Sequence, residues 1–184
     1  MTILVTGGAA SGKSEIAEKL AVELNQGRLG YFATMQATDA ESLARVEKHR
    51  RMRAGKGFKT VECPLGLPED GVLRKFDTVL LDCLSNFAAN VMFSAKKDEQ
   101  ETAQALASEL SRLFGSVKNA VVVTNEVFSD GVERYDGYTR AYIHALGVAN
   151  QALAARADVM IESVCGIAVF HKGRERLLDY ENFR

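Results

Sequence analysis

The segment that most constrains this chain is the glycine-rich run GGAASGKS at residues 7–14. It follows a short apolar run at 2–6 and precedes a segment in which Ile16, Leu20 and Leu24 recur at helical spacing. A strand, a glycine turn and a helix in this order, with Lys-Ser ending the turn, match the phosphate-binding pattern G-x-x-x-x-G-K-[ST]. A chance glycine turn would not be preceded by a strand, followed by a helix and ended by Lys-Ser. The sequence therefore predicts a nucleoside triphosphate site.

Each residue type in this loop has a physical role. Glycines let backbone N–H groups approach phosphate oxygens closely, and the helix N-terminus adds a favourable dipole. Lys13 is expected to reach the β- and γ-phosphates as a catalytic cation, and the Ser14 hydroxyl to ligate Mg²⁺. The nucleotide-binding residues predicted in the loop are Gly7, Gly8, Ala9, Ala10, Ser11, Gly12, Lys13 and Ser14.

Apolar β-branched runs alternate with longer amphipathic segments, which is typical of an α/β fold with a mainly parallel central sheet flanked by helices. Strands are expected at 2–6, 29–33, 59–63, 77–82 and 120–124, with a closing hairpin at 159–164 and 168–170. Helices are expected at 14–24, 39–53, 86–94, 100–114 and 138–156. Because no repeat, linker or low-complexity segment interrupts this order, residues 1–184 are expected to form one domain.

Net charge, apolar runs and cysteine spacing limit which partners and which cellular location are expected for this protein. The formal charge is −1, which argues against broad nucleic-acid binding. There is no apolar run of the roughly 20 residues that a membrane span needs, and the first residues lack a signal-peptide pattern, so a cytoplasmic protein is expected. Cys63, Cys83 and Cys165 form no zinc or disulfide spacing and are expected to be small buried residues.

Two acids follow predicted strands. Asp82 ends the run TVLLD and is expected to hold Mg²⁺ directly or through water; capping the next helix is a compatible alternative. Glu126 follows the run at 120–124. It is a candidate to ligate metal, orient a hydroxyl or act as general base, and a plain loop acid is an equal alternative.

The predicted helix at 39–53 ends in RVEKHRRMR, with five cations and His49 in residues 45–53. Such a run is usually a solvated helix face. Near a nucleotide, its cations would instead stabilise charge on a transferring group, and His49 would be a candidate nucleophile. His144 and His171 are expected to be structural or surface residues.

Taken together, these segments resemble the bifunctional adenosylcobinamide kinase / adenosylcobinamide-phosphate guanylyltransferase family of cobalamin biosynthesis. The resemblance runs along nearly the whole chain. The segments that carry it are 3–8, 11–14, 31–34, 45–50, 82–84 with Asn90, 124–127, Gly147, 150–151, 157–158 and 166–167.

The resemblance implies a RecA-like P-loop fold and a homotrimer. It also implies that His49 attacks the α-phosphate of GTP and that the GMP then passes to adenosylcobinamide phosphate, giving adenosylcobinamide-GDP. Arg45, Arg50 and Arg51 would stabilise the charge. The kinase step would phosphorylate adenosylcobinamide with ATP or GTP on the same loop, with Mg²⁺.

The chain departs from the family pattern at Ala10, where the family usually has Arg, at residues 131–134, and at Ile143 and His144. One alternative is a P-loop kinase for another small hydroxyl substrate, without guanylyltransferase activity. A second is a nucleotide-dependent switch or partner-binding protein. The guanine-specificity string N-K-x-D, which would favour a switch, does not occur in the sequence.

Overall fold

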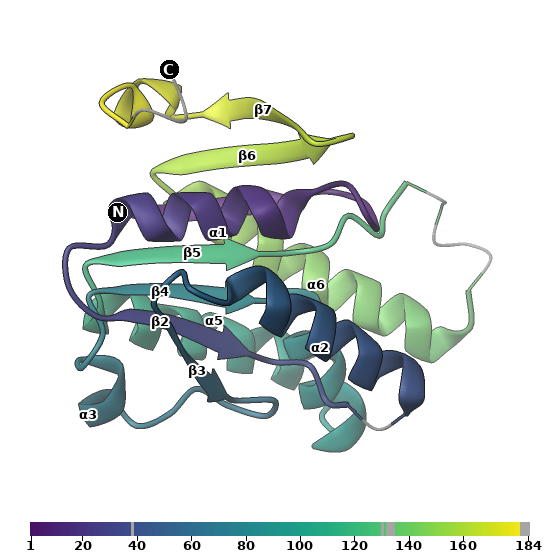
Figure 1. Cartoon of the computed structure of the whole chain (residues 1–184). Helices are drawn as coiled ribbons and strands as arrows, with labels where there is room; N and C mark the ends of the chain where they lie inside the picture. Colours follow the sequence, from purple (N-terminus) through teal and green to yellow (C-terminus); the bar gives the residue numbers. More distant parts are fainter. Residues whose placement is uncertain (38, 130, 132–134, 181–184) are drawn as a thin grey trace.

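The computed structural model describes residues 1–37, 39–129, 131 and 135–180, without the side chains of residues 41, 45 and 48. Its centre is a seven-stranded sheet in the order β3-β2-β4-β5-β1-β6-β7 (Figure 1). The strands are β1 (Thr2–Thr6), β2 (Leu29–Ala33), β3 (Phe58–Glu62), β4 (Thr78–Asp82), β5 (Asn119–Val123), β6 (Val159–Val164) and β7 (Ile167–Lys172). Neighbouring strands are parallel except β6 and β7, which form the predicted hairpin.

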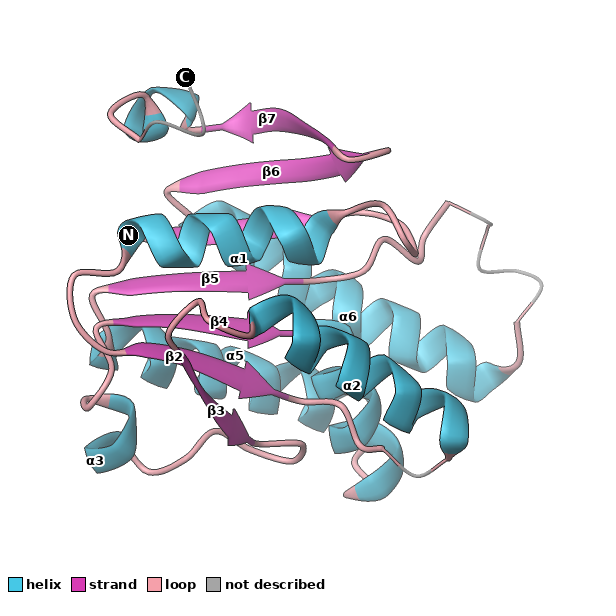
Figure 2. Ribbon diagram, in the orientation of Figure 1, coloured by secondary structure: helices cyan, strands magenta, loops and turns pink. Residues whose placement is uncertain are grey.

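The helices are α1 (Lys13–Leu24), α2 (Ala40–Arg53), α3 (Asp70–Leu73), α4 (Leu84–Ala89), α5 (Glu99–Ser116) and α6 (Gly137–Arg156), with a π-helix η1 (Asn90–Ser94) and a 3₁₀ turn η3 (Arg174–Leu177) (Figure 2). Aspartate side chains cap α2, α5 and α6 by accepting hydrogen bonds from backbone N–H groups three residues on. The single helix expected at 86–94 is instead α4 followed by η1. In the described part of the chain, no helix combines the length and apolarity that crossing a membrane requires.

Both faces of the sheet are covered. On one face, α1 packs the predicted stripe of Ile16, Leu20 and Leu24 against β1, β4 and β5. On the other face, α4, α5 and α6 pack together against the sheet (Figure 1). Because the central strands are buried on both sides, their sequences are continuous apolar runs rather than alternating ones.

The parallel strands bring three predicted segments to one edge of the sheet. The P-loop follows β1, α2 comes after β2, and Asp82 is the last residue of β4. All three therefore lie at the carboxyl ends of the strands, on the right in Figure 1. In open α/β sheets this edge is where ligands bind.

A buried ion pair links α1 to the turn that follows α2. Glu18 on α1 is 0% exposed, and one of its carboxylate oxygens accepts a hydrogen bond from Lys56 Nζ at 2.7 Å. The other oxygen, Oε1, is buried with no hydrogen-bond partner among the described residues. Lys56 is therefore the group that compensates the Glu18 charge.

Replacing Lys56 with methionine is expected to destabilise the protein by about 2–4 kcal/mol, since it leaves a buried carboxylate unpaired. The double variant Glu18→Gln/Lys56→Met should recover most of that loss. Chemical denaturation of the three proteins measures both values. Equal stability of Lys56→Met and wild type would show that the pair contributes nothing.

The expectation of three buried cysteines is wrong for one of them. Cys63 and Cys83 are buried, whereas Cys165 is exposed. Cys165 lies in the turn between β6 and β7 with a φ of +50°, where the hairpin faces solvent. His144 and His171 are confirmed as surface residues, paired with Glu99 and Glu162 respectively.

Candidate functional site

The loop at 7–14 makes the predicted turn from β1 into α1. Gly12 precedes the first residue of α1 with a φ of +93°, and Gly7 has a φ of +153°. A Cβ on Gly12 would lie 3.1 Å from the Cα of Gly166, so both backbone conformation and space require glycine there. Ala10, where the family usually has Arg, adopts a φ of +56° on the exposed side of the loop.

The C-terminal hairpin braces this loop. The carbonyl oxygen of Ser11 accepts hydrogen bonds from Ser163 Oγ at 2.7 Å and from the backbone N–H of Gly166 at 2.8 Å. Ser163 was not predicted as a site residue. The contact spans 152 positions in the sequence, so no local pattern could have indicated it. The shape of the phosphate loop thus depends on β6 and β7.

Replacing Ser163 with alanine is expected to lower stability by about 1 kcal/mol, because one buried hydrogen bond is lost. It should also raise the KM for the nucleotide several-fold, since the loop loses a brace. Steady-state kinetics and thermal unfolding measure both effects. Ser111→Ala, which removes an exposed hydroxyl bonded to Arg156, is the control. A KM equal to that of the control would contradict the bracing role.

Lys13 occupies the end of the loop and is half-buried. Its Nζ donates a hydrogen bond to the carbonyl of Gly8 at 2.9 Å. Burial lowers the pKa of Lys13, and negative charge at Cys83 and Asp82 opposes that shift. Burial raises the pKa of the Cys83 thiol, which leaves the Asp82 carboxylate as the acidic partner of Lys13. A cation in this partly desolvated position interacts strongly with a phosphate.

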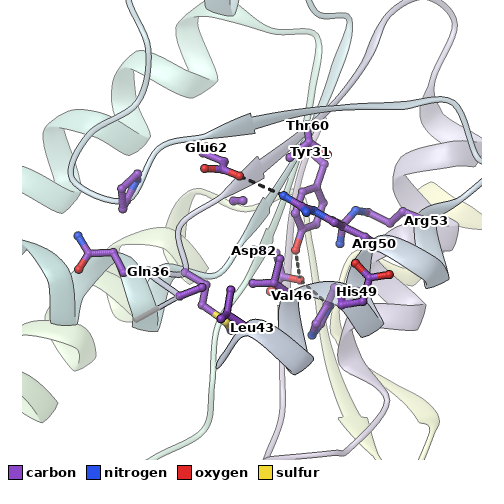
Figure 3. A pocket seen from close by; sticks show the side chains of 15 residues that line it. Tyr31, Gln36, Leu43, Val46, His49, Arg50, Arg53, Thr60, Glu62 and Asp82 are labelled. Carbon is purple, nitrogen blue, oxygen red and sulfur yellow. Dashed lines mark hydrogen bonds and ion pairs between the residues drawn. The ribbon is translucent and has the colours of Figure 1, made fainter. Parts of the chain in front are cut away.

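Asp82 also faces His49 (Figure 3). Its Oδ2 accepts a hydrogen bond from the Tyr31 hydroxyl at 3.0 Å and lies 3.7 Å from His49 Nδ1. The His49 Nδ1 atom is buried and has no hydrogen bond to any described residue. One carboxylate therefore interacts with the lysine of the P-loop and with the histidine of α2. The alternative that Asp82 caps a helix is wrong, because Cys83 occupies the N-cap position of α4 and makes no side-chain cap.

A cavity of about 600 Å³ opens beside His49 (Figure 3). Its walls come from α2, from the segment after β2, and from β3. Cationic, acidic and apolar side chains share the lining, including Arg50, Arg53, Glu47, Glu62, Leu43 and Val46. The cavity has room for a small substrate group next to the imidazole.

The cations of α2 whose side chains the structure describes divide into two groups. Arg51 is exposed and pairs with Glu47, and Arg50 is exposed and pairs with Glu62 at 3.4 Å, so the solvated-face interpretation holds for these contacts. Arg53 is only 7% exposed, and its guanidinium carbon lies 3.3 Å from the centroid of the Tyr31 ring. Arg45 was also predicted here, and its side chain lies outside the described residues.

Arg53 and Tyr31 were both missed as site residues. A signal existed for Arg53, which is four positions after His49 and therefore on the same side of α2. For Tyr31, the sequence indicated a place in the strand expected at 29–33 and in a segment of the family resemblance, but no role in the site. Tyr31 is 5% exposed, and its hydroxyl reaches from β2 to Asp82 on the neighbouring strand β4.

Glu126 has a local role. Its carboxylate accepts hydrogen bonds from the backbone N–H groups of Phe128 and Ser129 and from the Ser129 hydroxyl. Its own backbone N–H donates to the carbonyl of Gly7 at 3.0 Å. These contacts favour the loop-acid alternative, in which Glu126 closes the loop that lies against the P-loop.

The departures at Ile143 and His144 lie away from His49. Ile143 is buried in α6 and His144 is exposed, and both line a separate cavity of about 500 Å³ beside Phe128. Residues 132–134, including the departure at Arg134, lie outside the described residues.

Solved structures show the same fold. The flagellar accessory protein FlaH from Methanocaldococcus jannaschii aligns with a TM-score of 0.50 and 13% identity, over 93% of this chain and 77% of its own. The RadB recombinase aligns with a TM-score of 0.50 and 17% identity, over 88% of this chain and 73% of its own. The expected RecA-like P-loop fold is confirmed by these alignments.

Sequence relatives identify the family. The chain is 35% identical to the bifunctional adenosylcobalamin biosynthesis protein CobU of Escherichia coli K12, over 92% of this chain and 98% of the relative. It is 30% identical to CobP of Pseudomonas aeruginosa, over 94% of this chain and 98% of the relative. A family model for cobinamide kinase / cobinamide phosphate guanyltransferase matches residues 3–170. The chain therefore belongs to the cobinamide kinase / cobinamide phosphate guanyltransferase (CobU) family.

Proposed function

We propose that this protein is a transferase with two activities that share one P-loop. It phosphorylates adenosylcobinamide with ATP or GTP, and it then transfers GMP from GTP to that phosphate, giving adenosylcobinamide-GDP. Membership of the CobU family supports both steps. The observation that carries the second step is the position of His49, whose Nδ1 faces Asp82 at 3.7 Å on the sheet edge that also carries the P-loop.

The guanylyl transfer runs in two displacements. Nε2 of His49 attacks the α-phosphorus of GTP; the P–N bond forms, the bond to the bridging oxygen breaks, and pyrophosphate leaves with the electron pair. The negative charge of Asp82 stabilises the positive ring through its Nδ1 side. A phosphate oxygen of adenosylcobinamide phosphate then attacks the same phosphorus; the P–O bond forms, the P–N bond to His49 breaks, and the neutral imidazole is released.

Phosphoryl transfer depends on positioning and charge. Lys13 reaches the β- and γ-phosphates, and the loop backbone at 7–14 cradles them. The substrate hydroxyl attacks the γ-phosphorus and the nucleoside diphosphate leaves. Because Lys13 is partly desolvated, its positive charge strongly stabilises the negative charge that develops on the leaving oxygen.

Ser14 and Asp82 fit a Mg²⁺ ion that arrives with the nucleotide. Both offer oxygen donors, which this cation prefers, and few protein ligands suffice because phosphates and water complete its shell. Tyr31 engages Oδ2 of Asp82. When bound, the ion neutralises phosphate charge.

We further propose a cytoplasmic homotrimer: the trimer is what the family resemblance implies, and the formal charge of −1 argues against a nucleic-acid partner. Apolar side chains of the hairpin, Val164, Ile167 and Val169, are exposed in the single chain. Burying such side chains between subunits would stabilise an assembly. Sedimentation equilibrium measures the mass: three times 20.1 kDa supports the trimer, and a monomer at micromolar concentration contradicts it.

Incubation with α-labelled GTP tests the function. Acid-labile label should appear on the protein and pass to adenosylcobinamide phosphate when that acceptor is added. Phosphorylation of adenosylcobinamide by ATP is assayed separately. Kinase turnover without any protein label would favour the alternative, a P-loop kinase without guanylyltransferase activity, which the family match does not favour.

A further inference from the structure

We propose that Tyr31 and Arg53 are positioning residues for guanylylation, which hold Asp82 and His49 in the arrangement that leaves Nε2 as the attacking atom. This inference rests on the proposed function. Neither residue needs to contact the nucleotide. They act through a chain of contacts that runs from Arg53 to Tyr31, then to Asp82 and His49 (Figure 3).

Tyr31 sets the direction of the carboxylate. Its hydroxyl donates to Asp82 Oδ2 at 3.0 Å, and that same oxygen lies 3.7 Å from His49 Nδ1. A tyrosine hydroxyl carries a proton that it can donate, and an ionised carboxylate only accepts, so the direction of this hydrogen bond is fixed. The ring is held edge-on by Phe58, with centroids 6.2 Å apart and an interplanar angle of 85°. A rigid donor of this kind keeps Oδ2 close to His49 Nδ1.

Arg53 closes the chain of contacts from the helix side. Its guanidinium stacks on the Tyr31 ring at 3.3 Å, and it lies one helical turn after His49. Arg53 on α2 thus packs on Tyr31. His49 on the same helix faces Asp82, the carboxylate that Tyr31 orients. A shift of α2 relative to β2 would disturb both contacts together.

The burial of Arg53 is costly for folding. Its Nη1 atom is buried and has no hydrogen-bond partner among the described residues. A buried cation without full hydrogen bonding destabilises a protein, and stacking on an aromatic ring offsets only part of that cost. An apolar side chain would satisfy packing alone, so a cation here indicates a role beyond stability.

The arrangement also decides which nitrogen is free. A histidine whose Nδ1 carries its proton towards a carboxylate presents an unprotonated Nε2. Nδ1 lies 3.7 Å from Oδ2, and a shift of less than about 1 Å would bring the two atoms within hydrogen-bond distance. Tyr31 therefore influences the tautomer of His49 without touching it.

Tyr31→Phe is the decisive variant, because it keeps the ring and its stacking and removes only the hydroxyl. Single-turnover labelling with α-labelled GTP should show a maximal rate about 10-fold or more below wild type, with a half-saturating GTP concentration within about 2-fold. The matched control is Tyr142→Phe, which removes a half-buried hydroxyl bonded to the Ser85 carbonyl. That control should keep the wild-type rate.

A spectroscopic readout separates positioning from a general structural loss. ¹⁵N NMR of the nucleotide-free protein, at a pH where the ring is neutral, should assign the proton of His49 to Nδ1 in wild type and show a mixture of tautomers in Tyr31→Phe. An unchanged rate and an unchanged tautomer in that variant would overturn the proposal. Wild-type protein that takes no label would instead contradict the proposed function.

Arg53→Met tests the other end of the chain of contacts. It should retain the wild-type melting temperature or exceed it, because a costly buried charge is removed, and it should lower the maximal labelling rate several-fold. A rate equal to wild type would exclude Arg53 from the positioning role.

Discussion

Replacing His49 with alanine is expected to abolish covalent guanylylation while phosphorylation of adenosylcobinamide by ATP continues. The imidazole is the nucleophile in the proposed mechanism, and His49 is the one histidine among the described residues that line the cavity. Removal of a nucleophile lowers such rates by roughly 10⁴-fold or more. Acid-labile label from α-labelled GTP measures the first activity, and phosphate transfer from γ-labelled ATP measures the second.

His171→Ala is the matched control, since His171 is an exposed histidine on β7 that pairs with Glu162 on β6. It should retain both activities. Label that persists on His49→Ala protein would show that another residue carries GMP. Loss of both activities in His49→Ala, with its melting temperature unchanged, would show that the histidine also serves the kinase step.

Replacing Lys13 with methionine is expected to lower both activities by about 10²–10³-fold, because one cation serves both transfers. Lys13 is half-buried in the P-loop and interacts with the charge of Asp82, so its loss leaves phosphate charge uncompensated in a partly desolvated site. Methionine keeps the length of the lysine side chain up to Cε and removes only the ammonium group. Steady-state phosphorylation and single-turnover labelling measure the two losses in one preparation.

Lys19→Met is the control for this variant, since Lys19 is an exposed lysine on α1 that pairs with Glu15. It should behave as wild type in both assays. If Lys13→Met lost only phosphorylation and still took label at the normal rate, the GTP for guanylylation would lie outside the P-loop. The proposal that one loop serves both transfers would then be wrong.

Most of the fold was predictable because its signals are local. Continuous apolar runs indicated strands covered on both faces, and β1, β4 and β5 are such strands. Helical spacing of apolar residues indicated α1, whose stripe of Ile16, Leu20 and Leu24 packs against the sheet. The order of strands in the sheet has no such signal. The break between α4 and η1 was also missed, because an α-helix and a π-helix share nearly the same side-chain pattern.

The candidate site was only partly predictable. The P-loop was recognisable because all of its residues are consecutive, and His49 because cations surround it in the sequence. For Asp82, a strand end indicated an acid at the functional edge but not its pairing with Tyr31. For Glu126, position alone could not separate catalysis from the loop closure that its hydrogen bonds show.

The sequence by itself determined the α/β class, the phosphate loop at 7–14 and the candidate histidine, because backbone geometry and side-chain chemistry at neighbouring positions suffice for each. Only the tertiary structure decided that Asp82 interacts with both Lys13 and His49, that Arg53 lies on Tyr31, and that the C-terminal hairpin braces Ser11. Parallel strand pairing joins residues far apart in the chain. The resulting contacts follow from sheet order and from the docking of α2, neither of which leaves a local pattern.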